Sequence, residues 1–124
     1  MSELIYKEEA YKIIGVFMEV HKQLGKGFSE IVYKDAIEYE FKIRKYPYER
    51  EKQYEIKYKN IILPHKFFAD FVVFDKIVLE VKSSSGIADE FLKLTLNYLA
   101  ASKCKLGLIV NFGKDSLEYK RVVL

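Results

Sequence analysis

The sequence predicts an α/β fold in which helices cover a mixed β-sheet. Three observations lead to this prediction: two amphipathic helical segments open the chain, apolar runs of strand length follow, and a third helical segment separates these runs from two further strands. The chain has 124 residues, of which 50% are hydrophobic and 31% are charged, and this suits one domain with a real core. We therefore expect residues 1–124 to form a single domain, a two-layer or three-layer α/β sandwich on a mixed sheet.

The first two elements are predicted to be helices. Over residues 8–24 the apolar side chains recur at helical spacing, and Gly25 is a suitable stop for this helix. Ser29 is a suitable N-cap for a second helix that reaches about residue 44. The apolar face of this second helix consists of three residues: Tyr33, Ile37 and Phe41.

Strands dominate the rest of the chain. The alternation over residues 54–58 predicts a polar, edge-like strand, and Lys59 and Asn60 follow as a turn. Residues 66–74 and 76–82 are apolar on both faces, apart from a few charges, as in central strands that are covered on both sides. The connection between these two runs is so short that we expect a hairpin. A helix over about residues 87–102 and strands over residues 105–112 and 117–123 complete the prediction.

Composition limits the functional classes. The net charge of +3 permits binding of nucleic acid but does not require it. Cys104 is the single cysteine, which excludes an intramolecular disulfide and a cysteine zinc cluster. No apolar stretch is long enough to span a bilayer, and the N-terminus lacks the apolar region of a signal peptide, so we expect a cytoplasmic location and no membrane partner. The polar edge strand and the ten tyrosines suggest a homodimer.

The charges inside the two apolar strands are the strongest functional signal. Glu80 and Lys82 lie two residues apart and therefore point to the same side of their strand, and Asp70 lies in the preceding strand. Charges in an apolar strand are costly unless they are paired, hydrated or bound to a metal. Two carboxylates on facing positions of a hairpin can hold Mg²⁺ beside a reacting phosphate, and Lys82 would then orient the attacking water or stabilise the developing charge.

Each candidate has a simpler interpretation. Glu80 and Lys82 can form a salt bridge on a solvated sheet face, and spacing alone does not decide between the two readings. Glu30 shares a helix face with Tyr33, so we expect it to point inward, yet an acid in the first turn is also favoured by the helix dipole alone. His21 and His65 lack the spaced partners that a zinc site needs.

A basic cluster after the second helix is the remaining candidate. Its lysines and arginines alternate with tyrosines, which is a pattern that binds a nucleic-acid backbone and stacks on bases. Glutamates interrupt the cluster, so we interpret it as a solvated surface of mixed charge. The basic residues are Lys42, Arg44, Lys45, Arg50 and Lys52.

Several motifs together resemble a known family. The segment from Val20 to Ala36 contains a Gly-x-x-Glu-x-x-Tyr signature, with the glycine at Gly27. Further matching segments are Ala69-Asp70, Val78-Leu79-Glu80-Val81-Lys82, Leu96-Asn97-Tyr98-Leu99 and residues 106–113. The chain thus resembles the GxxExxY proteins, a branch of the PD-(D/E)xK nuclease superfamily, over nearly its whole length. The resemblance implies a restriction-endonuclease-like αβββαβ sandwich with a mixed central sheet, here with an extra N-terminal helix.

The resemblance also implies an activity and roles for single residues. It implies a nuclease that hydrolyses phosphodiester bonds of DNA or RNA with Mg²⁺ or Mn²⁺. Asp70 and Glu80 would be the metal-binding acids, Lys82 the catalytic lysine, and Glu30 a further acid of the site. Two tyrosines would lie against the substrate: Tyr33 and Tyr98.

One position departs from the pattern of related nucleases. They often carry a glutamine one helical turn before the tyrosine on the helix that follows the lysine strand, and here that position is Leu94. A leucine cannot hydrogen-bond a substrate or orient a water. The alternative function is therefore a catalytically inactive module on the same fold, which binds nucleic acid or another partner.

Overall fold

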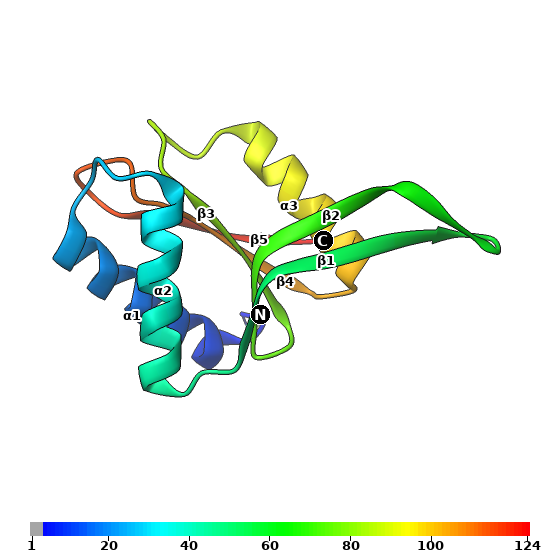
Figure 1. Cartoon of the computed structure of the whole chain (residues 1–124). Helices are drawn as coiled ribbons and strands as arrows, with labels where there is room; N and C mark the ends of the chain where they lie inside the picture. Colours follow the sequence, from blue (N-terminus) through cyan, green and yellow to red (C-terminus); the bar gives the residue numbers. More distant parts are fainter. Residues whose placement is uncertain (1–3) are drawn as a thin grey trace.

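The computed structural model of the protein describes residues 4–124 and shows a sheet between two layers of helices (Figure 1). The element order, helix, helix, three strands, helix and two strands, confirms the predicted α/β architecture. The elements are α1 (Lys7–Leu24), α2 (Glu30–Arg44), β1 (Tyr48–Tyr58), β2 (Ile61–Val73), β3 (Ile77–Lys82), α3 (Asp89–Ser102), β4 (Leu106–Asn111) and β5 (Glu118–Val123).

The sheet is mixed, with its five strands in the order of the sequence. β1 and β2 are antiparallel, as are β2 and β3, so the predicted hairpin between the second and third strands is confirmed. β3 and β4 are parallel, and α3 forms the crossover between them. β5 runs antiparallel to β4 and ends the sheet.

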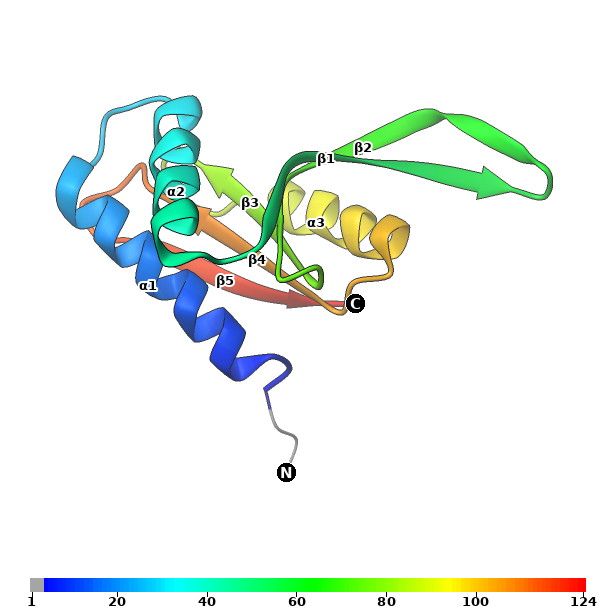
Figure 2. The same ribbon diagram turned by 60° about the horizontal axis from the view of Figure 1, so that its bottom comes forward.

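The two faces of the sheet carry different clusters. α1 and α2 cover one face, where the alternating residues Leu79 and Val81 of β3 join Phe17 and Phe41 of the helices in a fully buried core. α3 covers the other face, where Val78 of β3 lies in a smaller cluster. Because side chains alternate along a strand, Glu80 and Lys82 share the α3 side with Val78. Figure 2 shows the helices on opposite sides of the sheet.

The ends of the first two helices follow the predicted signals. Gly25 closes α1 with a φ of 67°, a conformation that costs glycine little. Ser29 occupies the N-cap position of α2, although its side chain makes no capping hydrogen bond. Among the described residues, no helix is both long and apolar enough to cross a membrane.

The β1–β2 hairpin is longer than predicted and extends past the rest of the sheet (Figures 1 and 2). β3 pairs with β2 only from Phe71 to Val73, so the earlier part of β2 has β1 as its single strand neighbour. We call residues 52–69 the arm. Pro64 lies at a register shift in a ribbon with a free edge, where its missing N–H is tolerated. The expectation that residues 66–74 are covered on both faces is therefore correct only from Ala69 to Val73.

Candidate active site

Asp70 lies where β2 and β3 separate. The last pair between the two strands toward the arm is Phe71 with Leu79. Beyond it, side chains replace the backbone ladder: the Asp70 carboxylate accepts a hydrogen bond from the Val81 amide at 2.7 Å, and the Asp70 amide donates to the Glu80 carboxyl at 3.2 Å. Because buried amides need acceptors, each acid is held by the backbone of the opposite strand. The two carboxyl groups of the sequence prediction are thus brought together.

Glu80 is buried to an unusual degree for an acid. Its side chain is 3% exposed on the α3 side of the sheet. Burial, followed by the negative charge of Asp70, raises the pKa of Glu80 to about 9, although the Asp70 amide and the charge of Lys82 act in the opposite direction. Two carboxyl groups that repel each other in a buried position are stabilised in their charged forms by a cation between them.

Lys82 and Tyr98 frame the carboxyl pair from the side of α3. The Lys82 ammonium lies 4.7 Å from the centre of the Phe91 ring, and its side of β3 is that of Glu80, as predicted. Tyr98 is almost completely buried and packs edge-to-face on Phe67 at 5.8 Å. Burial, followed by the charges of Glu80 and Asp70, raises the pKa of Tyr98, so its hydroxyl stays protonated. Because both charges act on it, Tyr98 lies on the side of α3 that faces the acids.

Lys34 is a member of the site that the sequence did not reveal. Its ammonium, on α2, donates to Asp70 at 3.0 Å and also pairs with Glu51 of β1. Burial opposes the charge of Lys34, but the hydrogen bonds to Glu51 and Asp70 outweigh it and raise its pKa. Glu51 has a φ of 54°, which a non-glycine residue rarely adopts. The sequence feature that could have indicated Lys34 as a site residue is its position three residues before the buried Ile37, on the same side of the helix.

The structure corrects the expectation that Glu30 points inward. Glu30 is exposed, because it is the first residue of α2 and lies before the buried stripe begins at Tyr33. Within residues 4–124 it makes no hydrogen bond or ion pair to Asp70, Glu80 or Lys82. Its end of the helix is nevertheless close to the end of β3, since the Ser83 hydroxyl donates to the carbonyl of Phe28 at 2.8 Å.

Tyr33 is fully buried and does not reach the surface where a substrate would bind. Its ring stacks on Phe112 at 4.5 Å. Its hydroxyl donates to the Gly25 carbonyl at 2.7 Å and accepts from the Phe28 amide at 3.3 Å. The tyrosine of the sequence signature therefore fastens the α1–α2 loop to the core, which corrects the predicted substrate contact.

The loop that follows Lys82 is held by Asn111 of β4. The buried Asn111 amide group accepts from the Ser84 amide at 2.9 Å and donates to the Ser84 carbonyl at 3.0 Å. A Cβ atom on Gly113 would lie only 2.2 Å from the Ser84 carbonyl oxygen, so this position requires glycine. The motif Val110-Asn111-Phe112-Gly113 thus fixes the path of the chain directly after the lysine.

The donor set suits a hard divalent cation that keeps some of its waters. Asp70 and Glu80 supply oxygen ligands, and one or two carboxylates plus substrate phosphate are sufficient for Mg²⁺. In the part of the chain that the structure describes, no three His, Cys, Asp or Glu side chains come close enough to form a complete metal cage. The buried Glu80 and the partly buried Asp70 therefore fit a metal site that substrate and water complete.

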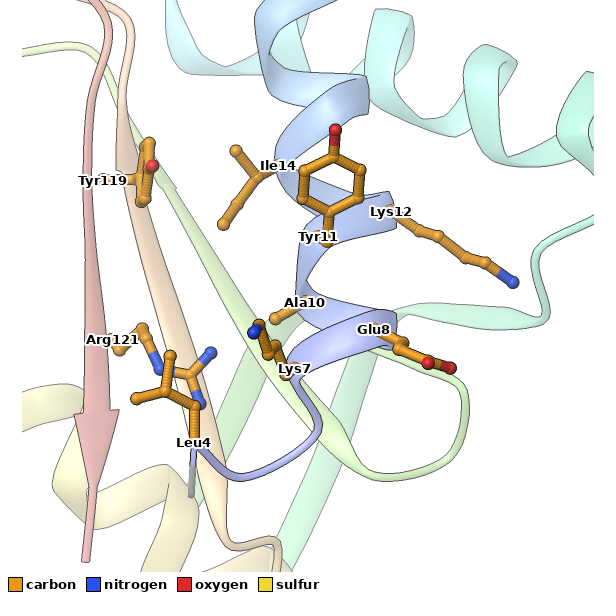
Figure 3. A pocket seen from close by; sticks show the side chains of 9 residues that line it. All are labelled: Leu4, Lys7, Glu8, Ala10, Tyr11, Lys12, Ile14, Tyr119 and Arg121. Carbon is orange, nitrogen blue, oxygen red and sulfur yellow. The ribbon is translucent and has the colours of Figure 1, made fainter. Parts of the chain in front are cut away.

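A separate groove of about 620 Å³ lies between α1 and β5 (Figure 3). Figure 3 shows Tyr11 and Ile14 of α1 opposite Tyr119 and Arg121 of β5, and the lining is mostly apolar. None of the acids or lysines described above lines this groove. The chemistry-bearing residues thus lie in a different part of the molecule from this cavity.

Comparison with known proteins agrees with this fold. The chain belongs to the PD-(D/E)XK nuclease superfamily, whose family model matches residues 7–122. One solved structure, "Crystal structure of SSO0001", has a similar fold, with a TM-score of 0.61 and 20% sequence identity. The similarity covers 74% of this chain and 49% of that chain, so the chain spans about half the length of this structural neighbour. A search of curated protein sequences found no match.

Proposed function

We propose that the protein is a nuclease of the GxxExxY branch that hydrolyses phosphodiester bonds of nucleic acid with Mg²⁺ or Mn²⁺. The observation that carries the proposal is the pairing of Asp70 with the buried Glu80 at the point where two strands separate, with Lys82 on the same side as Glu80. Membership of the nuclease superfamily supports it. We further propose that nucleic acid is the substrate of this protein, that the protein acts in the cytoplasm and that it assembles as a homodimer.

The proposed mechanism assigns a task to each side chain. Asp70 and Glu80 would hold the divalent ion, which when bound polarises a phosphate oxygen and acidifies water. Lys82 donates hydrogen bonds to the attacking water or to the phosphate oxygens as negative charge develops. Water adds to phosphorus and one P–O ester bond breaks, which leaves a phosphate monoester and a free hydroxyl. Tyr98 shields the acids from bulk solvent on the side of α3 and contributes a neutral hydroxyl toward the substrate.

Two further side chains complete the proposed site. Lys34 holds Asp70 in place from α2 and balances its charge. For Glu30 we propose a contact from the exposed rim with the substrate or with its waters, since its end of α2 adjoins the segment after Lys82. The rim position makes its contribution smaller than that of Asp70 or Glu80.

A second candidate is an inactive nucleic-acid-binding module. Leu94 favours it, because this side chain packs against the cluster under α3 and offers no hydrogen bond where related nucleases often have a glutamine. Lys34 favours it as well, since its ammonium already neutralises Asp70. This candidate predicts salt-sensitive binding without turnover.

Cleavage assays separate the two candidates. Labelled single-stranded and double-stranded DNA and RNA are incubated with purified protein in Mg²⁺, in Mn²⁺ or in a chelator. We expect metal-dependent cleavage that falls by about 100-fold or more in Asp70→Asn and in Lys82→Ala. Lys93→Ala is the matched control, because Lys93 is exposed on the neighbouring α3 helix.

The control variant should cleave like the wild-type protein, and circular dichroism should show that all variants are folded. Absence of cleavage with both metals on every substrate would overturn the nuclease proposal. Cleavage that persists in Lys82→Ala would identify a contaminating enzyme and would have the same consequence.

A further inference from the structure

The arm carries the net positive charge of the whole protein. Residues 52–69 contain four lysines and one glutamate, a net charge of +3, and the chain as a whole also has +3, with 21 basic and 18 acidic residues. Subtracting the arm leaves 17 basic and 17 acidic residues in the rest of the chain. The charge is therefore concentrated on one projecting element (Figure 2).

Three of the four lysines of the arm are free to bind a partner, whereas Lys52, at the base of the arm, pairs with Glu49 at 3.0 Å. Lys57, Lys59 and Lys66 are exposed, and within residues 4–124 none of them has an acidic partner within 4.0 Å. By comparison, Arg50 at the start of β1 pairs with Asp35 at 2.8 Å and with Glu38 at 3.0 Å. Within the basic cluster that the sequence indicated, Arg44, Arg50 and Lys52 are thus paired with acids, and the exposed lysines of the arm lie further along the same hairpin.

The arm also exposes apolar side chains near its tip. Tyr58 and Ile61 face each other across the hairpin, and Ile62 lies opposite Lys57. These three side chains are 57%, 56% and 52% exposed. Nearer the body, Tyr54 and Phe67 pack against the cluster under α3. The base of the arm is therefore fixed to the domain, and its outer part is unpartnered on both faces.

We propose that the arm lies in the major groove of duplex DNA, with its lysines on the phosphate backbones and its tip residues against base edges. A two-stranded β-ribbon fits a B-form major groove about 12 Å wide, whereas the deep, narrow major groove of A-form RNA excludes it. Residues 61–68 span about 26 Å at about 3.3 Å per residue, which is close to eight base pairs at about 3.4 Å each. The proposal rests on the proposed function, because it names the substrate of that site.

The position of the arm connects this binding to the acids. β2 passes without a break from the arm into Asp70, and Lys66 is four residues away, or about 13 Å along the strand. A duplex held by the arm would therefore have a backbone close to Asp70 and Glu80. Lys34 and Glu51, which meet at the base of the arm, hold this junction in place.

A second copy of the chain is a poorer occupant of this surface. Two arms that pair with each other would bring together two elements of net charge +3, and like charges that face each other across strands are destabilising. A polyanion with a groove has the complementary charge and shape. Self-association remains a distinct outcome of the experiment.

Fluorescence anisotropy of a labelled 20-base-pair DNA duplex tests the proposal without reference to cleavage. The full chain is titrated in a chelator at several NaCl concentrations. In the triple variant Lys57→Ala, Lys59→Ala, Lys66→Ala we expect about tenfold or greater loss of affinity, and a decrease of about 3 in the slope of log affinity against log salt, since each lost phosphate contact removes about 0.9. The matched control is Lys22→Ala, Lys105→Ala, Lys120→Ala, three exposed lysines outside the arm, which should bind like the wild type.

Two further measurements distinguish DNA from other partners. We expect at least about tenfold weaker binding of an RNA duplex of the same sequence. Equal binding of the RNA duplex, or equal affinity of the arm and control variants, would overturn the proposal. So would sedimentation that shows a dimer lost on Tyr58→Ser, Ile61→Ser, Ile62→Ser with DNA affinity unchanged.

The result is distinguishable from a failure of the nuclease proposal. Arm-dependent duplex binding with no cleavage would keep the docking surface and reject catalysis. Cleavage that needs Lys82 but is indifferent to the arm lysines would keep the nuclease and reject the docking surface.

Discussion

The two faces of the sheet use the same strands for different purposes. On the side of α1 and α2, the strands present large apolar residues that are fully buried with those of both helices. On the side of α3, β3 presents Val78, then Glu80 and Lys82, under a smaller cluster. The large apolar core on the α1–α2 face therefore allows the α3 face to carry buried charge, because a domain tolerates an unfavourable carboxyl pair when apolar burial elsewhere exceeds its cost.

We expect stability to depend most strongly on the side chains of the α1–α2 face. Phe112 is fully buried, stacks on Tyr33 at 4.5 Å and meets Phe17 edge-to-face at 6.3 Å. We expect Phe112→Ala to lower the free energy of unfolding by about 3–5 kcal/mol, because it leaves a cavity in the core. Urea denaturation followed by circular dichroism measures this change.

The matched control for this variant is Phe68→Ala in the arm. Phe68 is 50% exposed, so its truncation should change the unfolding free energy by less than about 0.5 kcal/mol. If Phe112→Ala lowered the free energy of unfolding by less than about 1 kcal/mol, the core on the α1–α2 face would not provide the stability that we assign to it.

The second effect is a pH dependence that arises on the α3 face. The pKa of Glu80 is raised to about 9, so in the absence of metal the folded protein keeps a proton that the unfolded chain releases above its ordinary pKa of about 4.3. Between these two values the folded state binds more protons, and its stability therefore falls as the pH rises. We expect a loss of at least about 1 kcal/mol between about pH 5.5 and about pH 8.5 in a chelator.

Glu80→Gln should remove this slope while it keeps the hydrogen bond from the Asp70 amide. Mg²⁺ or Mn²⁺ should also flatten the slope in the wild type, because a bound cation stabilises the charged carboxylate. Glu90→Gln, an exposed acid of α3, should retain the wild-type slope. If the Glu80 variant kept that slope too, the raised pKa could not belong to Glu80.

The smallest effect is expected at the rim. Glu30 is exposed, so Glu30→Gln should change the unfolding free energy by less than about 0.5 kcal/mol. As a rim contact, it should lower the cleavage rate by less than about tenfold, against about 100-fold for Asp70→Asn. Single-turnover cleavage and urea denaturation measure the two quantities, and a loss as large as that of Asp70→Asn would place Glu30 at the centre of the site.

Much of the fold was predictable because local patterns agreed with one another. The spacing of apolar residues, Gly25 at the end of α1 and the short connection between β2 and β3 gave the correct element order and the correct hairpin. The boundaries of the β1–β2 hairpin were missed. Pro64 and the lysines lower the strand signal of the arm, and its pairing depends on β1 rather than on burial.

For the candidate site, strand alternation was enough to place Glu80 and Lys82 on one side. It could not show that the Asp70 carboxylate accepts the hydrogen bond of the Val81 amide in place of a backbone carbonyl. This bond forms only because β2 and β3 separate after Phe71. Helical spacing misplaced Glu30, because a residue in the first turn can share a helix face with buried residues and still lie before the buried part of that face begins. Lys34 was invisible for a similar reason: its partners come from two strands distant in the sequence.

Local spacing and chain connectivity were enough to predict the α/β class, the order of the elements, and the two acids and the lysine on neighbouring strands. Only the folded chain shows how deeply Glu80 is buried, that Lys34 contacts Asp70, that Tyr33 belongs to the core, and that the β1–β2 hairpin projects as a basic arm. Burial and charge pairing depend on which elements meet in space, and the packing of the whole chain settles which elements meet.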